Sequence, residues 1–207
     1  MRPVVYLHGF ASGPTSSKAR FFKQRLEAAG IPVTVPDLAA GDFPHLTITG
    51  QLRVLQQAAG AGPVSLMGSS MGGYLAALYA ARHPEVERLV LMAPGFRFAT
   101  RWPELQGAEA MEQWRRTGSM EVFHYAENRP MQLSTDIITD SEQYEGEPAF
   151  QQPALIFHGI HDDVVPIEYS RQFAAGRKNV QLFEMDAGHD LLNMLEPIAA
   201  KTLDWFQ

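Results

Sequence analysis

The chain has 207 residues, of which 45% are hydrophobic, 19% charged and 10% aromatic. This composition excludes a disordered or fibrous chain, and a chain of this length buries enough surface to fold without disulfides or a metal. Asp and Glu number 23 against 17 for Lys and Arg, so the net charge is −6 and gives no electrostatic reason to bind nucleic acid or an anionic membrane. The absence of cysteine excludes a disulfide scaffold, a thiol nucleophile and cysteine-ligated metal.

The first residues carry no recognisable targeting signal. The apolar run at residues 4–7 follows Met1-Arg2-Pro3 directly and is far shorter than the core of a signal peptide. No run approaches the roughly 18 apolar residues that a membrane span requires. We therefore expect a cytoplasmic protein without a membrane span.

Short apolar runs alternate with amphipathic helical stretches along most of the chain. Runs of this kind are typical of parallel strands that are covered on both faces. The strand candidates are residues 4–7, 33–35, 64–67, 89–92, 154–157 and 180–183. The helix candidates are residues 16–29, 47–59, 71–83, 168–175 and 191–205. The alternation predicts an α/β fold with a doubly wound, mostly parallel sheet of about six strands and helices on both faces.

One connection is much longer than its neighbours. Residues 94–148 contain no clear strand, and a helix is predicted at residues 103–117. The segment is rich in aromatic residues, namely Phe96, Phe98, Trp102, Trp114, Phe123, Tyr125 and Tyr144. A connection of this length is usually functional or itself folded. We expect a small helical cap over the carboxyl edge of the sheet, inserted in a single domain of residues 1–207. A surface excursion that packs its aromatic side chains on the body is the alternative.

The sequence Gly68-Ser69-Ser70-Met71-Gly72 matches the pattern G-x-S-x-G with Ser70 at its centre. A strand candidate ends just before it and a helix candidate begins within it, which is the context of a nucleophile elbow. The sharp turn is expected to force Ser70 to a positive φ, while the two glycines let strand and helix cross closely. A turn that serves only packing or phosphate binding is the alternative, but no G-K-[ST] or G-x-G-x-x-G supports it.

A nucleophilic serine needs a base that is held by an acid, and after an elbow the acid and then the histidine follow later strands. The fifth strand candidate is followed by Asp162 and Asp163, and the last is followed by His189. Both loops leave the same edge of the sheet as Ser70, so these side chains are predicted to converge on it. His189 then accepts the serine proton and Asp162 fixes the imidazole tautomer. Spacing alone leaves Asp163 open as the acid; we interpret it as a cap of the following turn.

An oxyanion hole is expected where the first strand ends, at His8-Gly9-Phe10. The backbone N–H groups of Phe10 and Met71 are the predicted donors, and one such donor is typically worth about 2.7–4 kcal/mol. His8 is interpreted as a residue that braces this loop. Asp190 is interpreted as the N-cap of the last helix.

Three aromatic residues just after the fourth strand candidate, Phe96, Phe98 and Trp102, are candidates for the lining of an acyl pocket. Packing inside the cap is the alternative. His158-x-x-His161-Asp162 offers side chains that could ligate a metal, but no H-E-x-x-H or His-x-His-x-Asp-His motif accompanies it. We expect neither a metal nor a cofactor.

Taken together, these motifs resemble those of the α/β-hydrolase superfamily over essentially the whole chain. The residues that carry the resemblance are His8-Gly9-Phe10, Gly68 to Gly72, His158-Gly159-x-x-Asp162 with Val165-Pro166, and Gly188-His189. In that superfamily the acid is the last residue of His-Gly-x-x-Asp, which favours Asp162 over Asp163. The N-terminal segment and the elbow are similar to those of small bacterial YqiA-like esterases, although the segment 94–148 is fuller.

The resemblance implies a trimmed, six-stranded hydrolase that lacks the antiparallel hairpin with which the family usually begins. It implies a serine esterase acting on a small-molecule ester through an acyl-enzyme, because the Asp-nucleophile members of the fold carry Asp where this chain has Ser70. The modest cap and the single glycine of the oxyanion loop favour short to medium acyl chains. An acyl thioesterase is the alternative, and a non-catalytic binding protein is a more distant one. The oligomeric state stays open.

Overall fold

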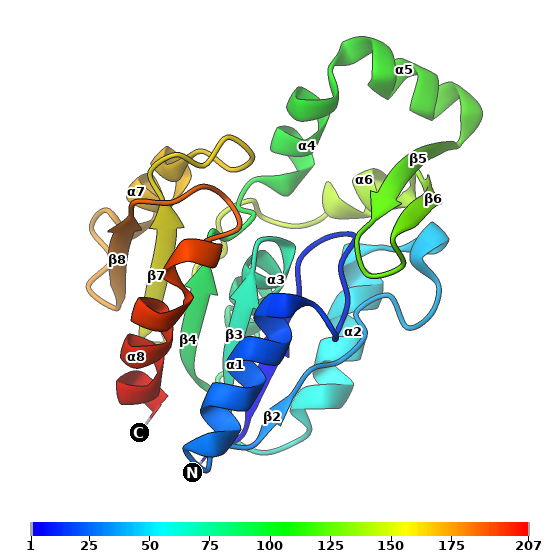
Figure 1. Cartoon of the computed structure of the whole chain (residues 1–207). Coiled ribbons are helices and arrows are strands. Elements are labelled where there is room, and N and C mark those ends of the chain that lie inside the picture. Colours follow the sequence, from blue (N-terminus) through cyan, green and yellow to red (C-terminus); the bar gives the residue numbers. More distant parts are fainter. Residues whose placement is uncertain (1, 207) are drawn as a thin grey trace.

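The computed structural model describes residues 2–206. Six strands form one sheet in the order β2-β1-β3-β4-β7-β8, and all neighbouring strands are parallel (Figure 1). Their bounds are β1 Val4–Leu7, β2 Val33–Thr34, β3 Val64–Ser69, β4 Val86–Met92, β7 Ala154–Gly159 and β8 Val180–Met185. The predicted parallel sheet is therefore confirmed. β4 begins earlier than expected, and its pairing with β3 shifts register between Val64 and Leu66.

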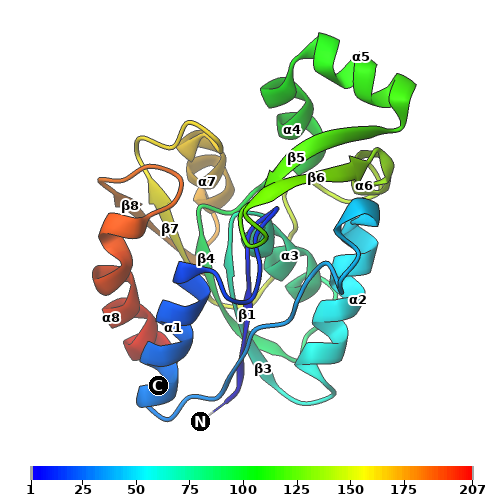
Figure 2. The same cartoon turned by 45° about the vertical axis from the view of Figure 1, so that its right-hand side comes forward.

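Helices cover both faces of the sheet (Figures 1 and 2). One face carries α1 (Ser17–Ala28) and α8 (Leu195–Phe206), and the other carries α2 (Ile48–Ala59), α3 (Met71–Ala80) and α7 (Ile167–Ala174). Successive side chains of a strand point to opposite faces, so alternate residues of each strand enter two separate hydrophobic clusters. This explains why the strands are continuous apolar runs.

The segment between β4 and β7 contains two strands, which contradicts the expectation that it has none. β5 (Ser119–His124) and β6 (Arg129–Ser134) pair as an antiparallel hairpin that extends beyond the carboxyl ends of the parallel strands (Figure 2). The sequence does not indicate the hairpin, because polar and apolar residues are mixed in both strands and most of these residues are exposed or half-buried, so the strands lack the apolar run that marks the others. The position fits a cap, and that role remains a prediction.

The helix expected at residues 103–117 is in fact two helices. α4 (Phe98–Gln106) starts earlier than predicted and ends at Gly107, whose φ of +82° no longer fits a helix. α5 (Ala108–Thr117) follows directly and is tied to the hairpin because the buried Trp114 ring donates a 3.0 Å hydrogen bond to the Leu133 carbonyl. The short α6 (Asp136–Ser141) completes the segment. None of the helices within residues 2–206 is long and apolar enough to cross a membrane.

The crossing of β3 and α3 leaves no room for side chains at two positions. A Cβ at Gly68 would lie 2.2 Å from the Gly72 carbonyl oxygen, and a Cβ at Gly72 would lie 2.1 Å from the Leu7 carbonyl oxygen. The helix therefore packs directly on the backbones of β3 and β1. Every residue of α3 is buried as a result.

We predict that Gly72→Ala destabilises the fold by about 3 kcal/mol or more, because the added methyl group forces β1 and α3 apart. Chemical denaturation measures the change. Gly62→Ala is the matched control, since a Cβ there meets nothing within 4 Å, and its effect should stay within about 0.5 kcal/mol. Equal stability of the two variants would contradict the close crossing.

Candidate active site

Ser70 occupies the turn between β3 and α3, with φ +54° and ψ −119°, so the predicted positive φ is confirmed. Its N–H donates to the Met92 carbonyl at 2.9 Å, and its own carbonyl accepts from the N–H groups of Gly95 at 2.9 Å and Tyr74 at 3.1 Å. These bonds fix the strained backbone from β4, the following loop and α3. The hydroxyl is thereby held at the carboxyl edge of the sheet.

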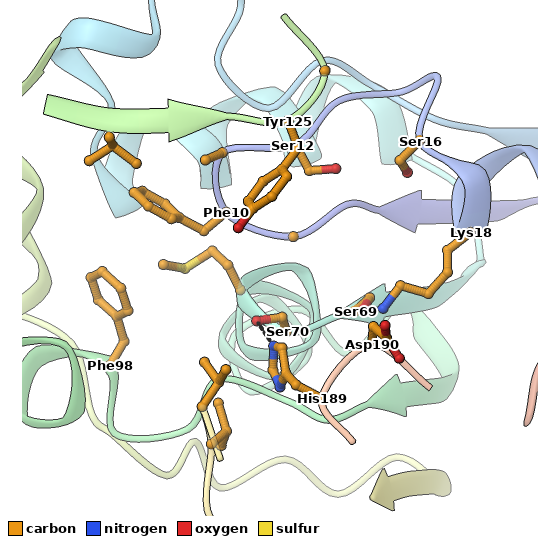
Figure 3. A pocket seen from close by; sticks show the side chains of 18 of the residues that line it. Phe10, Ser12, Ser16, Lys18, Ser69, Ser70, Phe98, Tyr125, His189 and Asp190 are labelled. Atoms are coloured by element: carbon orange, nitrogen blue, oxygen red, sulfur yellow. Dashed lines mark hydrogen bonds between the residues drawn. The ribbon is translucent and has the colours of Figure 1, made fainter. Parts of the chain in front are cut away.

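The structure brings Ser70, His189 and Asp162 together. His189 Nδ1 lies 2.7 Å from Asp162 Oδ2, and His189 Nε2 lies 3.0 Å from Ser70 Oγ (Figure 3). Because an ionised carboxylate only accepts hydrogen bonds, Nδ1 carries the proton and Nε2 is free to accept from the serine hydroxyl. Asp163 does not take part in this series of hydrogen bonds. Its backbone carbonyl accepts a hydrogen bond from the Arg101 side chain.

The Asp162 carboxylate is buried and accepts from four donors. Oδ1 accepts from the N–H groups of Val164 at 2.9 Å and Val165 at 2.8 Å, and Oδ2 lies 3.1 Å from His158 Nε2 in addition to His189. Burial opposes the charge, but the hydrogen bonds from His158 and His189 outweigh it and hold the pKa of Asp162 below its ordinary 3.8. Asp162 therefore stays ionised, and it also caps the turn that sequence reasoning had assigned to Asp163.

His158 is a positioning residue that sequence analysis had placed only in the acid loop. The ring is fully buried, with Nδ1 2.7 Å from Ser170 Oγ and Nε2 2.9 Å from the Val165 carbonyl. The partners assign the proton to Nε2, which donates toward Val165 and Asp162 while Nδ1 accepts from the Ser170 hydroxyl. The spacing of four residues in His158-Gly159-x-x-Asp162 indicates that His158 lies near the acid. The contacts of its ring with Ser170 and with the Val165 carbonyl become apparent only in the folded structure.

The loop after β1 lies against the elbow, as a Cβ built on Gly9 would be 3.6 Å from Ser70 Cβ. Within residues 2–206 the N–H groups of Phe10 and Met71 donate to no protein acceptor, and both residues line the cavity beside Ser70. They are thus available to a ligand. His8 Nε2 accepts from the Leu38 N–H at 3.2 Å, so its expected bracing role is confirmed.

A cavity of about 830 Å³ opens beside Ser70 and has two unlike ends. In Figure 3, Phe10 and Phe98 lie on one side of the Ser70–His189 pair, and Lys18, Ser69 and other polar side chains lie on the opposite side. This volume is in the range of pockets that enclose small organic molecules.

The three aromatic candidates for the acyl pocket differ in their surroundings. Trp102 lies 4.7 Å from the Phe10 ring and 5.9 Å from the Phe98 ring, at the apolar end of the cavity. Phe96 borders the cavity but is fully buried, and its ring stacks at 4.3 Å on Phe173 in the core. Phe98 and Trp102 therefore fit a pocket lining better than Phe96 does.

Two polar residues near Ser70, Asp190 and Lys18, make contacts that the sequence does not predict. Asp190 does not cap α8; its Oδ1 accepts from the Leu192 N–H at 3.1 Å, at the first residue of the short 3-10 helix η2 (Leu192–Met194), whose N-cap is Leu191. Lys18 was not considered, although its Nζ lies 2.7 Å from Ser69 Oγ. In the part of the chain that the structure describes, no group of three His, Asp or Glu side chains is arranged to hold a metal ion.

The parallel sheet, the elbow and the loops at its carboxyl edge define a protein with the α/β-hydrolase fold. Residues 3–203 match the Uncharacterised protein family (UPF0227), and the chain belongs to that family. No curated protein matches its sequence.

Solved structures with the same fold are similar over nearly the whole chain. Mouse alpha/beta hydrolase domain-containing protein 10 superposes with a TM-score of 0.82 at 18% identity, over 99% of this chain and 89% of that one. The Paleococcus ferrophilus monoacylglycerol lipase gives 0.79 at 18% identity, over 98% and 93%. Est1E from Butyrivibrio proteoclasticus gives 0.74 at 20% identity, over 99% and 86%.

We predict that His158→Leu lowers the free energy of unfolding by about 2–4 kcal/mol, because it removes one of the four donors to Asp162 and takes the His158 partner from the Val165 carbonyl and the Ser170 hydroxyl. His161→Leu is the matched control in the same loop, since that side chain is exposed and pairs only with the exposed Asp186; its effect should stay within about 0.5 kcal/mol. Denaturant titration of both variants measures the difference. Similar losses would show that His158 does not hold the acid loop.

Proposed function

We propose that the protein is a serine hydrolase that cleaves carboxylic esters. The observation that carries this proposal is the hydrogen-bonded chain from Ser70 through His189 to Asp162. A serine hydroxyl becomes a useful nucleophile only beside a base that an acid orients. In this proposal His189 is the base and Asp162 is the acid. The similar structures include a monoacylglycerol lipase and Est1E, which has been observed with ferulic acid bound, and they support acyl chemistry.

In the first half of the proposed reaction, Ser70 Oγ attacks the acyl carbonyl carbon and its proton passes to His189 Nε2. The Phe10 and Met71 N–H groups donate to the oxyanion of the tetrahedral intermediate. Asp162 stabilises the imidazolium and keeps Nδ1 protonated. The C–O bond to the alcohol then breaks, and His189 gives its proton to the departing oxygen, which leaves an acyl-enzyme on Ser70.

In the second half, a water molecule attacks the acyl-enzyme and His189 accepts one of its protons. Collapse of the second tetrahedral intermediate breaks the bond to Ser70 Oγ, which takes the proton back from His189. The products are a carboxylic acid and an alcohol, and the enzyme is regenerated.

The cavity supports short to medium acyl chains as substrates. Its apolar end is formed by Phe10, Phe98, Trp102 and neighbouring side chains of the segment between β4 and β7. In this proposal that segment acts as a cap that covers the acyl group. Exposed apolar side chains also line the cavity, and these are Leu105, Phe123, Tyr125, Val164 and Leu192.

We predict that the protein hydrolyses p-nitrophenyl esters with a maximum at short or medium chains, between acetate and octanoate. Ser70→Ala should lower kcat by at least about 10³-fold, because the nucleophile is lost while the fold is retained. Absorbance of p-nitrophenolate measures turnover across a series from acetate to palmitate, and circular dichroism checks the fold. Turnover of acyl-CoA but not of oxygen esters would favour the thioesterase, and absence of turnover of either would contradict the proposal.

We predict that Asp162→Asn lowers kcat by about 10⁴-fold, because an amide no longer fixes the His189 tautomer. Asp163→Asn is the matched control: it changes the neighbouring carboxyl, has no contact with His189 and should leave kcat close to that of the wild type. Steady-state kinetics with p-nitrophenyl butyrate compares the two. A dead Asp163→Asn beside an active Asp162→Asn would reverse the assignment of the acid.

A further inference from the structure

The polar end of the cavity contains a lysine that the proposed mechanism does not use. Lys18 lies in the first turn of α1, and its side chain reaches across to Ser69 Oγ at 2.7 Å (Figure 3). Ser69 is the last residue of β3, is buried, and immediately precedes Ser70. The ammonium group therefore lies beside the proposed nucleophile, on the side of Ser70 opposite the aromatic residues.

The charge of Lys18 is not neutralised by a direct ion pair. In the described part of the chain no carboxylate contacts its Nζ, whereas the exposed Lys23 on the same helix pairs with Glu27 at 3.0 Å. Burial lowers the pKa of Lys18 to about 8, while the more distant charges of Asp190 and Asp162 favour the protonated form. An ammonium group has three N–H donors, and Ser69 accepts only one of them. The others are available to a ligand in the cavity.

Two hydroxyl side chains, Ser12 and Ser16, also line the cavity. In Figure 3, Ser12 lies beside Tyr125, and Ser16 lies near the start of α1, where its Oγ accepts from the Ala19 N–H. Ser16 is the N-cap of α1, so the partial positive charge of the helix N-terminus adds to that of the ammonium group. An ammonium group with free N–H donors is a suitable partner for an oxyanion.

We propose that Lys18 binds a carboxylate carried by the alcohol part of the substrate. This inference rests on the proposed function, in which the acyl chain lies at the aromatic end and the leaving group at the Lys18 end. The substrate class is then a short or medium acyl ester of a hydroxy acid. A single carboxylate fits better than a dianionic phosphate, because Asp190 places a negative charge at the same end.

A matched pair of esters tests this substrate class. The anionic 4-butyryloxybenzoate and its neutral methyl ester differ only at the carboxyl group, so the ratio of their kcat/KM values reports on the subsite. The wild type should prefer the anionic ester. Lys18→Met should lower the ratio about 10- to 100-fold, the loss expected for a hydrogen bond to a charged group. An unchanged ratio in Lys18→Met would overturn the subsite.

Two further variants sharpen this test. Asp190→Asn should raise the ratio, because it removes a like charge while Asn Oδ1 still accepts the Leu192 N–H. Lys23→Met removes an exposed lysine of the same helix and should leave the ratio at the wild-type value. A ratio that falls equally in the Lys18 and Lys23 variants would reflect general charge rather than a site, and would overturn the proposal.

The pH dependence of the same ratio is a second readout. The groups whose charges act on Lys18 are Asp190 and Asp162, and both favour its protonated form. Since the ammonium group loses its proton as the pH rises through its lowered pKa, the preference for the anionic ester should decline between about pH 7 and about pH 10. Any effect of pH on the ester-cleaving steps common to both esters cancels in the ratio. A preference that stays constant over this range would contradict the role of the ammonium group.

Binding of the ether 4-butoxybenzoate separates the subsite from catalysis, because this molecule has no ester to cleave. Titration calorimetry should show binding to the wild type and at least about 10-fold weaker binding to Lys18→Met. Lys18-dependent binding without turnover of any ester would keep the subsite and reject the proposed function. Ser70-dependent ester turnover without Lys18-dependent binding or selectivity would reject the subsite alone.

Discussion

The close crossing of β3 and α3 over the end of β1 is the constraint on which the candidate site depends. Glycines at positions 68 and 72 let the helix backbone touch both strands, and the turn between them gives Ser70 its positive φ. The same contact brings the loop after β1 against the elbow and places Ser69 within reach of Lys18. The candidate nucleophile, the candidate oxyanion donors and the polar end of the cavity thus share one structural origin.

The orientation of His189 depends in turn on a buried negative charge at Asp162. A carboxylate removed from water is costly unless donors replace the water, and here two backbone N–H groups and two histidines do so. His158 and the following turn fix the carboxylate, and the carboxylate in turn orients His189. These hydrogen bonds hold the Asp162 side of the site in one geometry. On the other side of the cavity, the segment between β4 and β7 contributes exposed apolar side chains to the lining.

Much of this could be predicted from the sequence, because G-x-S-x-G is a local pattern and parallel topology brings the ends of β3, β7 and β8 to one edge. Other features depend on contacts that no local pattern records. Spacing could not separate Asp162 from Asp163, and the Lys18–Ser69 contact joins residues 51 positions apart. The β5–β6 hairpin has exposed, mixed-polarity strands, and Gly107 divides a helical stretch that sequence periodicity treats as continuous.

The proposed function requires Ser70 to be a nucleophile that His189 activates. Covalent labelling with a fluorophosphonate, followed by mass spectrometry of the intact protein and its peptides, tests it without knowledge of the substrate. We predict a single adduct on Ser70, no adduct in Ser70→Ala, and labelling slowed by orders of magnitude in His189→Ala. An unlabelled wild-type protein, or an adduct on Ser69 or another residue that persists in Ser70→Ala, would contradict it.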